Sequence, residues 1–185
     1  MQNQYKMNRI FLAALMLFIF SCSDKENLET IEALQTQLTA HKMKTDLAIK
    51  NKNTVKDFFN ALMAEDAIAV SNLFAVDGKQ INPYHSNLFP KGAEGKDAIL
   101  KYWEPVFPNF DGMIFSIEEL YAMEDPNRVF VKYTGNIKLK DNIGVYSNNY
   151  YSTFKFNSQE KITEYVEIFN PITAAKGFGL LDKIK

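Results

Sequence analysis

The sequence predicts an α+β domain in which three N-terminal helices pack on one curved antiparallel sheet. Two observations carry this prediction. Apolar residues recur at helical spacing in three segments between residues 53 and 107. From residue 113 to residue 170 the apolar period changes to two, in four long segments joined by short turns. Helices followed by a run of antiparallel strands are typical of the α+β class, and we expect a cone-shaped roll.

The composition fits one domain with extensions and excludes several classes of function. Of the 185 residues, 46% are hydrophobic and 14% aromatic, which is enough for a real core. The 21 Lys and Arg nearly balance 22 Asp and Glu without a basic stripe, so nucleic acid is not an expected partner. Cys22 is the only cysteine, and His41 and His85 stand apart, so we expect no metal site. No phosphate-binding loop appears, and we expect no cofactor.

Residues 1–21 have the pattern of a signal peptide. Lys6 and Arg9 precede an apolar run over residues 10–20. This run is shorter than the roughly 20 apolar residues of a comfortable membrane span. We therefore expect a signal peptide that is cleaved from the mature protein. The alternative is a short membrane helix.

The apolar run ends at Phe20-Ser21-Cys22, which resembles the lipobox of bacterial lipoproteins. In that family the cysteine carries acyl chains, palmitate among them, and becomes the mature N-terminus. Phe20 departs from the pattern, because a small residue usually stands there. The resemblance implies that lipidated Cys22 anchors the protein, since several acyl chains hold a protein on a membrane stably.

The charged run over residues 23–26 resembles the surface-export signal of some Gram-negative outer-membrane lipoproteins, although the solvated start of a linker explains it equally well. We expect an outer-membrane lipoprotein in the cell envelope and leave the leaflet, including surface exposure, open. Residues 22–52 are expected to form a partly helical tether with four apolar residues at helical spacing: Leu28, Ile31, Leu34 and Leu38.

The domain is expected to begin with a helix capped by Asn53 or Thr54. Its apolar residues mark one helix face: Val55, Phe58, Phe59, Leu62 and Met63. The next predicted elements are a helix over 67–75, a turn at Asp77-Gly78, a strand over 79–82, a loop over 83–95, and a helix over 96–107 closed by Pro108.

The four long strands are expected over residues 113–123, 128–140, 146–156 and 161–170, and they form a meander. Residues 173–185 are expected to be a C-terminal tail. The Gly177-Phe-Gly179 pattern in that tail is assigned no role.

This order of elements resembles the nuclear transport factor 2-like superfamily, which includes ketosteroid isomerases and SnoaL-like polyketide cyclases. Three stretches carry the resemblance: Phe59 to Gly78, Gly95-Lys-Asp-Ala-Ile99 and Glu167-Ile-Phe-Asn170. It covers residues 53–172. Within the superfamily, four stretches are most similar to the phenazine-biosynthesis A/B type: residues 107–110, 124–131, 146–156 and 161–170. The fold hosts enzymes, binders and scaffolds alike, so the resemblance alone does not choose among them.

The resemblance bears on two kinds of chemistry. Ketosteroid isomerases use a Tyr and a protonated Asp as an oxyanion hole. The matching positions here hold Phe58 and Asn82, which cannot do this work, so steroid isomerase chemistry of that type is not expected. In phenazine-type proteins a pocket glutamate donates or accepts a proton, and the matching residue is Glu167. The histidine that partners it has no counterpart in the helix over 96–107.

Glu167 is the candidate acid or base on residue grounds as well. Strand alternation places Thr163, Tyr165 and Phe169 on its face, and Ile162, Glu164, Val166, Ile168 and Asn170 on the other. A carboxylate among aromatics loses hydration, which raises its pKa. The alternatives are an exposed Glu167 or an ion pair with a lysine such as Lys132. His85 in the loop is a candidate second proton-transfer group, although a lone loop histidine is more often exposed.

Six aromatic residues are candidates for lining a ligand pocket: Tyr84, Tyr102, Trp103, Tyr133, Tyr150 and Tyr165. Each of them can instead simply fill the core. Three functions therefore stay open. The domain binds a small, partly apolar molecule beside Glu167, or it is a cofactor-independent isomerase or cyclase that uses Glu167. The third alternative is a scaffold or protein-interaction module, in which the sheet face forms a homodimer or a partner interface.

Overall fold

The computed structural model describes residues 2–141 and 143–183, with side chains from residue 25 onward. The chain forms two compact units, Met1–Lys44 and Thr45–Lys185. Helix α1 (Gln2–Met63) belongs to both. The predicted helix start at Asn53 or Thr54 is wrong, because no Pro or Gly interrupts residues 2–63 and the Thr54 hydroxyl bonds the carbonyl of Lys50 within the helix.

In the first unit the backbone is helical from residue 2 through the rest of the predicted signal peptide and along the tether as far as residue 44. The side chain of the predicted lipidation site, Cys22, lies outside the described residues. The apolar stripe from Leu28 to Leu38 is exposed to solvent. Within the described residues, no helix combines the length and hydropathy that a membrane span requires.

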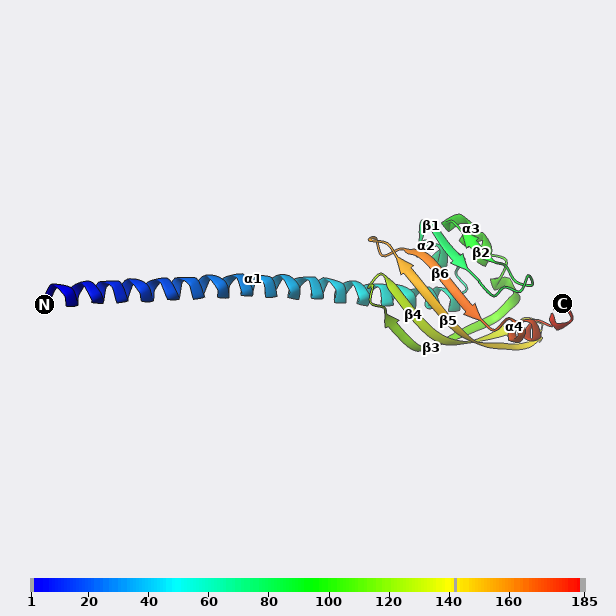
Figure 1. Ribbon diagram of the computed structural model, residues 1–185. Helices are drawn as coiled ribbons and strands as arrows, with labels where there is room; N and C mark the ends of the chain where they lie inside the picture. The colour runs from blue at the N-terminus through cyan, green and yellow to red at the C-terminus, as the bar shows by residue number, and fades with distance from the viewer. Residues whose placement is uncertain (1, 142, 184–185) are drawn as a thin grey trace. The chain divides into compact units, whose positions relative to one another are not determined.

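The second unit is built on a curved, open, six-stranded sheet in the order β2-β1-β6-β5-β4-β3 (Figure 1). Its strands are β1 (Phe74–Ile81), β2 (Gly92–Glu94), β3 (Phe110–Ala122), β4 (Arg128–Leu139), β5 (Gly144–Phe156) and β6 (Ile162–Phe169). Strands β3 to β6 form the predicted meander, and β1 joins its edge parallel to β6. The predicted α+β class is confirmed.

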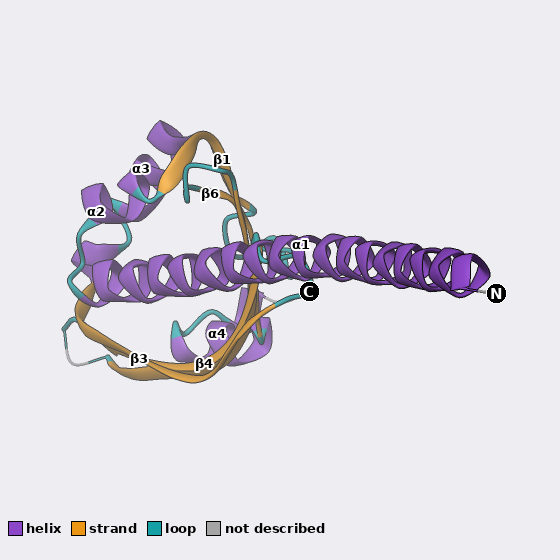
Figure 2. Ribbon diagram, turned by 90° about the vertical axis from the view of Figure 1, so that its left-hand side faces the viewer, coloured by secondary structure: helices purple, strands orange, loops and turns teal. Residues whose placement is uncertain are grey.

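Three helical segments lie on the inner side of the sheet's curve, as Figure 2 shows. They are the end of α1, α2 (Ala67–Asn72) and α3 (Lys96–Trp103). Asp66 caps α2 by accepting a hydrogen bond from the backbone N–H of Ala69 at 2.8 Å. Helix α3 ends earlier than predicted, because Pro105 cannot continue a helix, and a 3₁₀ turn (Phe107–Asn109) follows.

Strand β1 begins earlier than predicted. The segment after α2 pairs with β6, and the backbone N–H of Ile162 donates to the carbonyl of Leu73 at 2.9 Å. Gly78, predicted as a turn residue, lies instead within an irregular part of β1. A Cβ there would stand 2.7 Å from the carbonyl oxygen of Ile162, so glycine permits the two strands to approach.

The C-terminal tail contains a helix that the sequence analysis missed. Helix α4 (Pro171–Gly177) is capped by Asn170, whose side-chain oxygen accepts from the backbone N–H groups of Ile172 and Thr173 at 3.0 and 3.2 Å. Pro171 stands at its first position, where a missing N–H costs nothing. Two buried alanines, Ala174 and Ala175, dock α4 on the domain.

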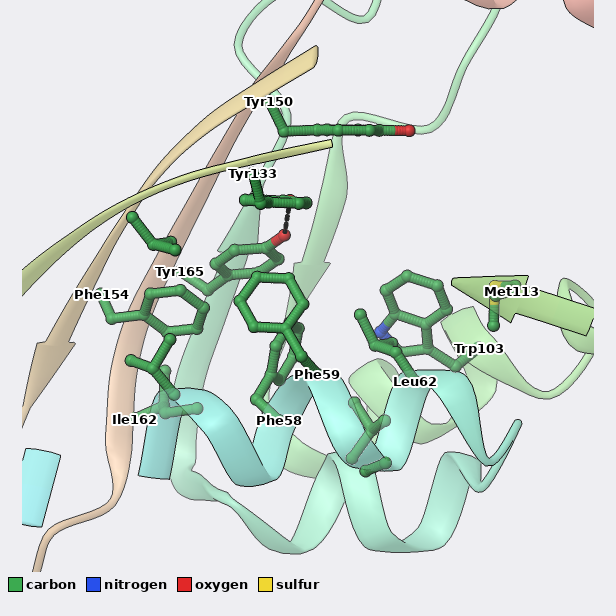
Figure 3. Close-up of a cluster of buried hydrophobic side chains, with 14 of the residues drawn as sticks. Phe58, Phe59, Leu62, Trp103, Met113, Tyr133, Tyr150, Phe154, Ile162 and Tyr165 are labelled. Carbon is green, nitrogen blue, oxygen red and sulfur yellow. Dashed lines mark hydrogen bonds between the residues drawn. The ribbon is translucent and has the colours of Figure 1, made fainter. Parts of the chain in front are cut away.

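The core lies where α1 meets the inner face of the sheet (Figure 3). Phe58 packs on Phe154 with ring centroids 5.2 Å apart, and Phe59 packs on Tyr133 at 4.5 Å. Ile162 is also fully buried there, although strand alternation predicted the other face. A register shift between β5 and β6 at Lys155 and Phe156 turns it inward.

Candidate functional site

A cavity of about 560 Å³ opens beyond the end of α1, between the sheet, α3 and α4. Most of its wall is apolar, and nine rings contribute to it: Phe89, Tyr102, Trp103, Phe110, Phe115, Tyr146, Tyr150, Phe169 and Phe178. The charged residues among the described lining are Glu167 in the interior and Lys140 and Asp141 in the exposed turn between β4 and β5. The cavity is therefore an aromatic chamber with one carboxylate inside.

Glu167 stands at the border between the cavity and the packed core. Its Oε1 accepts hydrogen bonds from the hydroxyls of Tyr165 at 2.9 Å and Tyr133 at 3.2 Å. The two hydroxyls lie 3.1 Å apart, and that of Tyr133 is also 3.3 Å from Ser152 Oγ. Oε2 has no hydrogen-bond partner among the described residues, and the residue lines the cavity. One oxygen is thus held by the core while the other is available to a bound molecule.

Burial raises the pKa of Glu167, and the hydrogen bonds from Tyr165 and Tyr133 lower it without offsetting that effect. Two tyrosine donors on one oxygen stabilise the ionised carboxylate, and burial favours the neutral acid. The alternative ion pair with Lys132 is wrong, because that ammonium lies 2.9 Å from Glu118 and 3.5 Å from Glu119. Glu167 can therefore accept a hydrogen bond when ionised and donate one when protonated.

Tyr102 offers a hydroxyl to the same cavity. Its oxygen accepts a hydrogen bond from Asn82 Nδ2 at 3.0 Å, and the same nitrogen donates to the carbonyl of Pro90 at 3.0 Å. Since the hydroxyl oxygen accepts from Asn82, its proton is free to donate to a bound molecule. Burial raises the pKa of Tyr102, and the charge of Glu167 raises it further, so this hydroxyl stays neutral.

A second free hydroxyl proton belongs to Tyr146. Its oxygen accepts from Asn148 Nδ2 at 2.8 Å and from the hydroxyl of Tyr150 at 3.0 Å. The ring of Tyr150 stacks on Tyr133 with centroids 4.8 Å apart, as Figure 3 shows. Gly135 makes room for this stack, because a Cβ there would lie 2.9 Å from ring atoms of both Phe115 and Tyr150.

A family model for the SnoaL-like domain matches residues 55–165, which is more than half of the chain. The chain belongs to the SnoaL-like domain family. Sequence comparison with curated proteins gives no match.

Solved structures with the fold of this SnoaL-like domain include proteins of several kinds. A phenazine biosynthesis-related protein from Pseudomonas aeruginosa is 21% identical, with TM-score 0.64, covering 75% of this chain and 91% of that one. A Catenulispora acidiphila protein with a ketosteroid isomerase-like fold, in complex with trimethylamine, is 16% identical, with TM-score 0.59, covering 69% and 92%. An LEH-like epoxide hydrolase from M. tuberculosis is 18% identical, with TM-score 0.58, covering 70% and 89%. At these identities the likeness concerns the fold.

Four of the predicted site residues line the cavity of the SnoaL-like domain: Tyr102, Trp103, Tyr150 and Glu167. Trp103 donates from Nε1 to Gln80 Oε1 at 3.0 Å, which fixes its indole. Tyr133 and Tyr165 are fully buried behind Glu167, where they hold its carboxylate instead of lining the cavity. Strand alternation had placed Tyr165 on the face of Glu167, and Tyr133 reaches the same carboxylate from β4.

Tyr84 and His85 do not line the cavity. Tyr84 is 58% exposed, and the Nδ1 atom of His85 accepts a hydrogen bond from the backbone N–H of Asn87 at 3.0 Å, within its own turn. The loop instead turns Phe89 and Pro90 toward the cavity. The expectation that His85 works beside Glu167 is corrected accordingly, and the polar group on that wall is the Asn82–Tyr102 pair.

The sequence analysis missed Tyr146, Asn82 and the C-terminal segment as parts of the site. Phe178 and Leu180 line the cavity, although the tail was assigned no role. Two signals were available. The Asn-Pro start of α4 is a helix cap with proline at N1. Gly177 lies where a Cβ would stand 2.6 Å from Cδ2 of Tyr146, so the glycine marks a close approach to the wall.

Proposed function

We propose that this SnoaL-like domain binds a small, partly apolar molecule in the cavity, with Glu167 Oε2 holding the molecule's polar group. One observation carries the proposal: Glu167 is half-buried and lines an aromatic chamber, and its Oε2 has no hydrogen-bond partner among the described residues. Polar groups that are withdrawn from solvent are normally hydrogen-bonded, so a carboxylate oxygen beside a cavity is suited to bind a polar group of a ligand. The volume of about 560 Å³ lies within the range of small-molecule sites.

The two free hydroxyl protons support this proposal. Tyr102 and Tyr146 each accept hydrogen bonds from the protein, which leaves their protons for an acceptor on the ligand. A molecule with an apolar body and a few polar substituents satisfies these groups. A protein with the same fold forms a complex with trimethylamine, which is consistent with ligand binding by such a domain.

A cofactor-independent isomerase or cyclase is the second candidate, and the raised pKa of Glu167 favours it. A raised pKa makes a carboxyl group a better proton acceptor when it is ionised, which suits general acid–base work. Tyr102, whose proton is free, would then stabilise a developing oxyanion. Glu167→Gln distinguishes the two functions, because a binder retains affinity for neutral ligands while an acid–base enzyme loses turnover.

A scaffold that forms a homodimer through the sheet is the third candidate. Its support is the exposed apolar side chains of the outer face, among them Ile114, Tyr151 and Ile168. Sedimentation of the wild type and of Ile168→Lys tests it. A dimer that becomes a monomer in the variant supports the scaffold, and a wild-type monomer excludes it.

We also propose that Cys22 is lipidated and anchors the domain in the outer membrane of a Gram-negative envelope. The support is the sequence pattern of residues 1–22. Metabolic labelling with an alkyne palmitate analogue should label the wild type and leave Cys22→Ser unlabelled. Labelling that persists in Cys22→Ser contradicts the proposal.

The binding proposal is tested by a thermal-shift screen of the full chain against a panel of metabolites, beside Glu167→Gln. We expect saturable stabilisation by one chemical class, and a changed shift in the variant. Glu164→Gln is the matched control, because it removes a carboxylate from the outer face of the same strand, next to Lys155 in register. No shift with any compound contradicts the proposal and favours the scaffold.

A further inference from the structure

The charges around Glu167 are unbalanced. No lysine or arginine in the described part of the chain contributes to the pKa of Glu167, whose shift comes from burial and from two tyrosine hydrogen bonds. The lining lysine, Lys140, lies in the exposed turn at the mouth, next to Asp141. When Glu167 is ionised, the interior therefore carries one negative charge without a positive partner among the described residues. A buried carboxylate in this state is costly unless a cation joins it.

The rest of the wall suits an organic cation. Nine aromatic rings line the cavity. The face of an aromatic ring attracts an ammonium group, and the attraction is stronger where water is excluded. Aromatic rings also pack favourably against the alkyl or aryl substituents that such a cation carries. The two tyrosines that hold Oε1 stabilise the ionised carboxylate and leave Oε2 toward the cavity.

We infer that the ligand of this cavity is an organic ammonium, a substituted amine whose charge lies against Glu167 Oε2 and whose apolar groups contact the aromatic wall. The inference rests on the proposed binding function and names its ligand class. It excludes carboxylates and phosphates, which would face Glu167 with no interior cation. It also predicts that a neutral molecule of the same shape binds more weakly than the ammonium, because a neutral molecule leaves the charge of Glu167 uncompensated.

The pH dependence follows from the groups around the carboxylate. Besides Lys140 and Asp141 at the mouth, they are tyrosines of α3, β4, β5 and β6, each with a pKa raised above its usual value and so neutral near pH 7: Tyr102, Tyr133, Tyr146, Tyr150 and Tyr165. Glu167 is therefore the interior group that changes charge. Affinity for a permanent cation rises as the pH rises through the pKa of Glu167. Affinity for a neutral hydrogen-bond acceptor falls, because the protonated acid donates to it.

The test uses three probes of nearly one shape. They are (4-hydroxyphenyl)trimethylammonium, its uncharged carbon isostere 4-tert-butylphenol, and the anion 4-tert-butylbenzoate. Dissociation constants are measured by titration calorimetry on the full chain over a series of pH values that begins near the usual glutamate pKa of about 4.3 and rises from there. We expect the cation to bind at least about tenfold more tightly than its isostere at the upper pH. The anion should not bind.

Two variants complete the experiment. In Glu167→Gln the preference for the cation over the isostere should disappear while the isostere still binds, and in Glu164→Gln the preference should be unchanged. The inference is overturned if the isostere binds the wild type as tightly as the cation, or if the preference survives in Glu167→Gln. Binding of the isostere or of an anion alone leaves the proposed function standing and removes the inference. If no probe and no compound of the thermal-shift panel binds, both fail.

Discussion

Aromatic residues line both ends of the domain, but they form packed core at one end and the wall of a cavity at the other. At one end Phe58, Phe59 and Leu62 of α1 fill the curve of the sheet and pack against its aromatic rings. We call this the packed end. At the other end, the hollow end, α1 has stopped at Met63, and an equally aromatic wall encloses a cavity of about 560 Å³. The comparison teaches that aromatic content does not separate core from site. What separates them is whether side chains of α1 fill the space in front of the sheet.

Glu167 lies where these two ends meet. Its Oε1 belongs to the packed end, through Tyr133 and Tyr165, and its Oε2 belongs to the hollow end. A carboxylate deeper in the core would have no oxygen facing the cavity, and a carboxylate nearer the surface would be hydrated by solvent. Its position at the border explains both a raised pKa and an oxygen available to a ligand.

The largest effect is expected in the packed end. Phe59→Ala removes a ring that is 1% exposed and lies 4.5 Å from Tyr133. We expect the free energy of unfolding to fall by about 3–5 kcal/mol, since the transfer and cavity terms add. Urea unfolding followed by near-UV circular dichroism measures it. A loss below about 1 kcal/mol would mean that this end is not packed as described.

A smaller loss is expected where α4 meets the hollow end. Gly177→Ala places a Cβ 2.6 Å from Cδ2 of Tyr146 and forces that ring to move. We expect a cost of about 1–3 kcal/mol from overpacking. Movement of Tyr146 also disturbs its hydrogen bonds with Asn148 and Tyr150, so ligand affinity should fall too. Unchanged unfolding and unchanged binding would show that the C-terminal segment does not form the wall.

The comparison is sharpest in Phe178→Ala, which matches Phe59→Ala in chemistry. Phe178 is half-buried and already borders the cavity, so its removal leaves less new empty space. We expect the free energy of unfolding to fall by no more than about 2 kcal/mol, at the low end for phenylalanine truncation. Ligand affinity should weaken more than stability does. Equal destabilisation by the two truncations would remove the distinction between packed and hollow ends.

The smallest change in stability is expected for Glu167→Gln, and its sign depends on pH. The pKa of Glu167 is raised in the folded protein, so folding binds a proton that the unfolded chain releases more easily. The stability of the wild type is therefore full below the usual glutamate pKa of about 4.3 and falls as the pH rises through the folded value. The glutamine variant does not lose stability in this way, so its stability relative to that of the wild type should increase as the pH rises. Thermal melts of both proteins across this range measure the difference, and parallel curves would contradict it.

Much of the fold was predictable because periodicity reports the burial of each face directly. The change from helical spacing to alternation gave the class, and the alternation of Tyr165, Glu167 and Phe169 placed the carboxylate on the inner face. The errors in the predicted ends and faces of elements arose at single residues. Pro105 shortened α3, and an irregularity in the β5–β6 pairing turned Ile162 inward.

The hollow end was less predictable for a physical reason. Periodicity tells which way a side chain points, and it does not tell whether anything fills the space in front of it. Tyr133 and Tyr150 are neighbours in one stack, yet the first supports Glu167 from the core and the second lines the cavity. The contribution of Phe178 depends on how α4 docks, which no local pattern in the tail specifies.

The most direct test of the account is the titration of the Glu167 side-chain carboxyl by carbon-13 nuclear magnetic resonance, assigned by comparison with Glu167→Gln. The account predicts a pKa above the usual value of about 4.3 in the free protein, and a shift of that resonance when the cavity is filled by the compound that stabilises the domain most. A usual pKa, together with a resonance that does not respond to that compound, would show that Glu167 does not stand at the border of a ligand site.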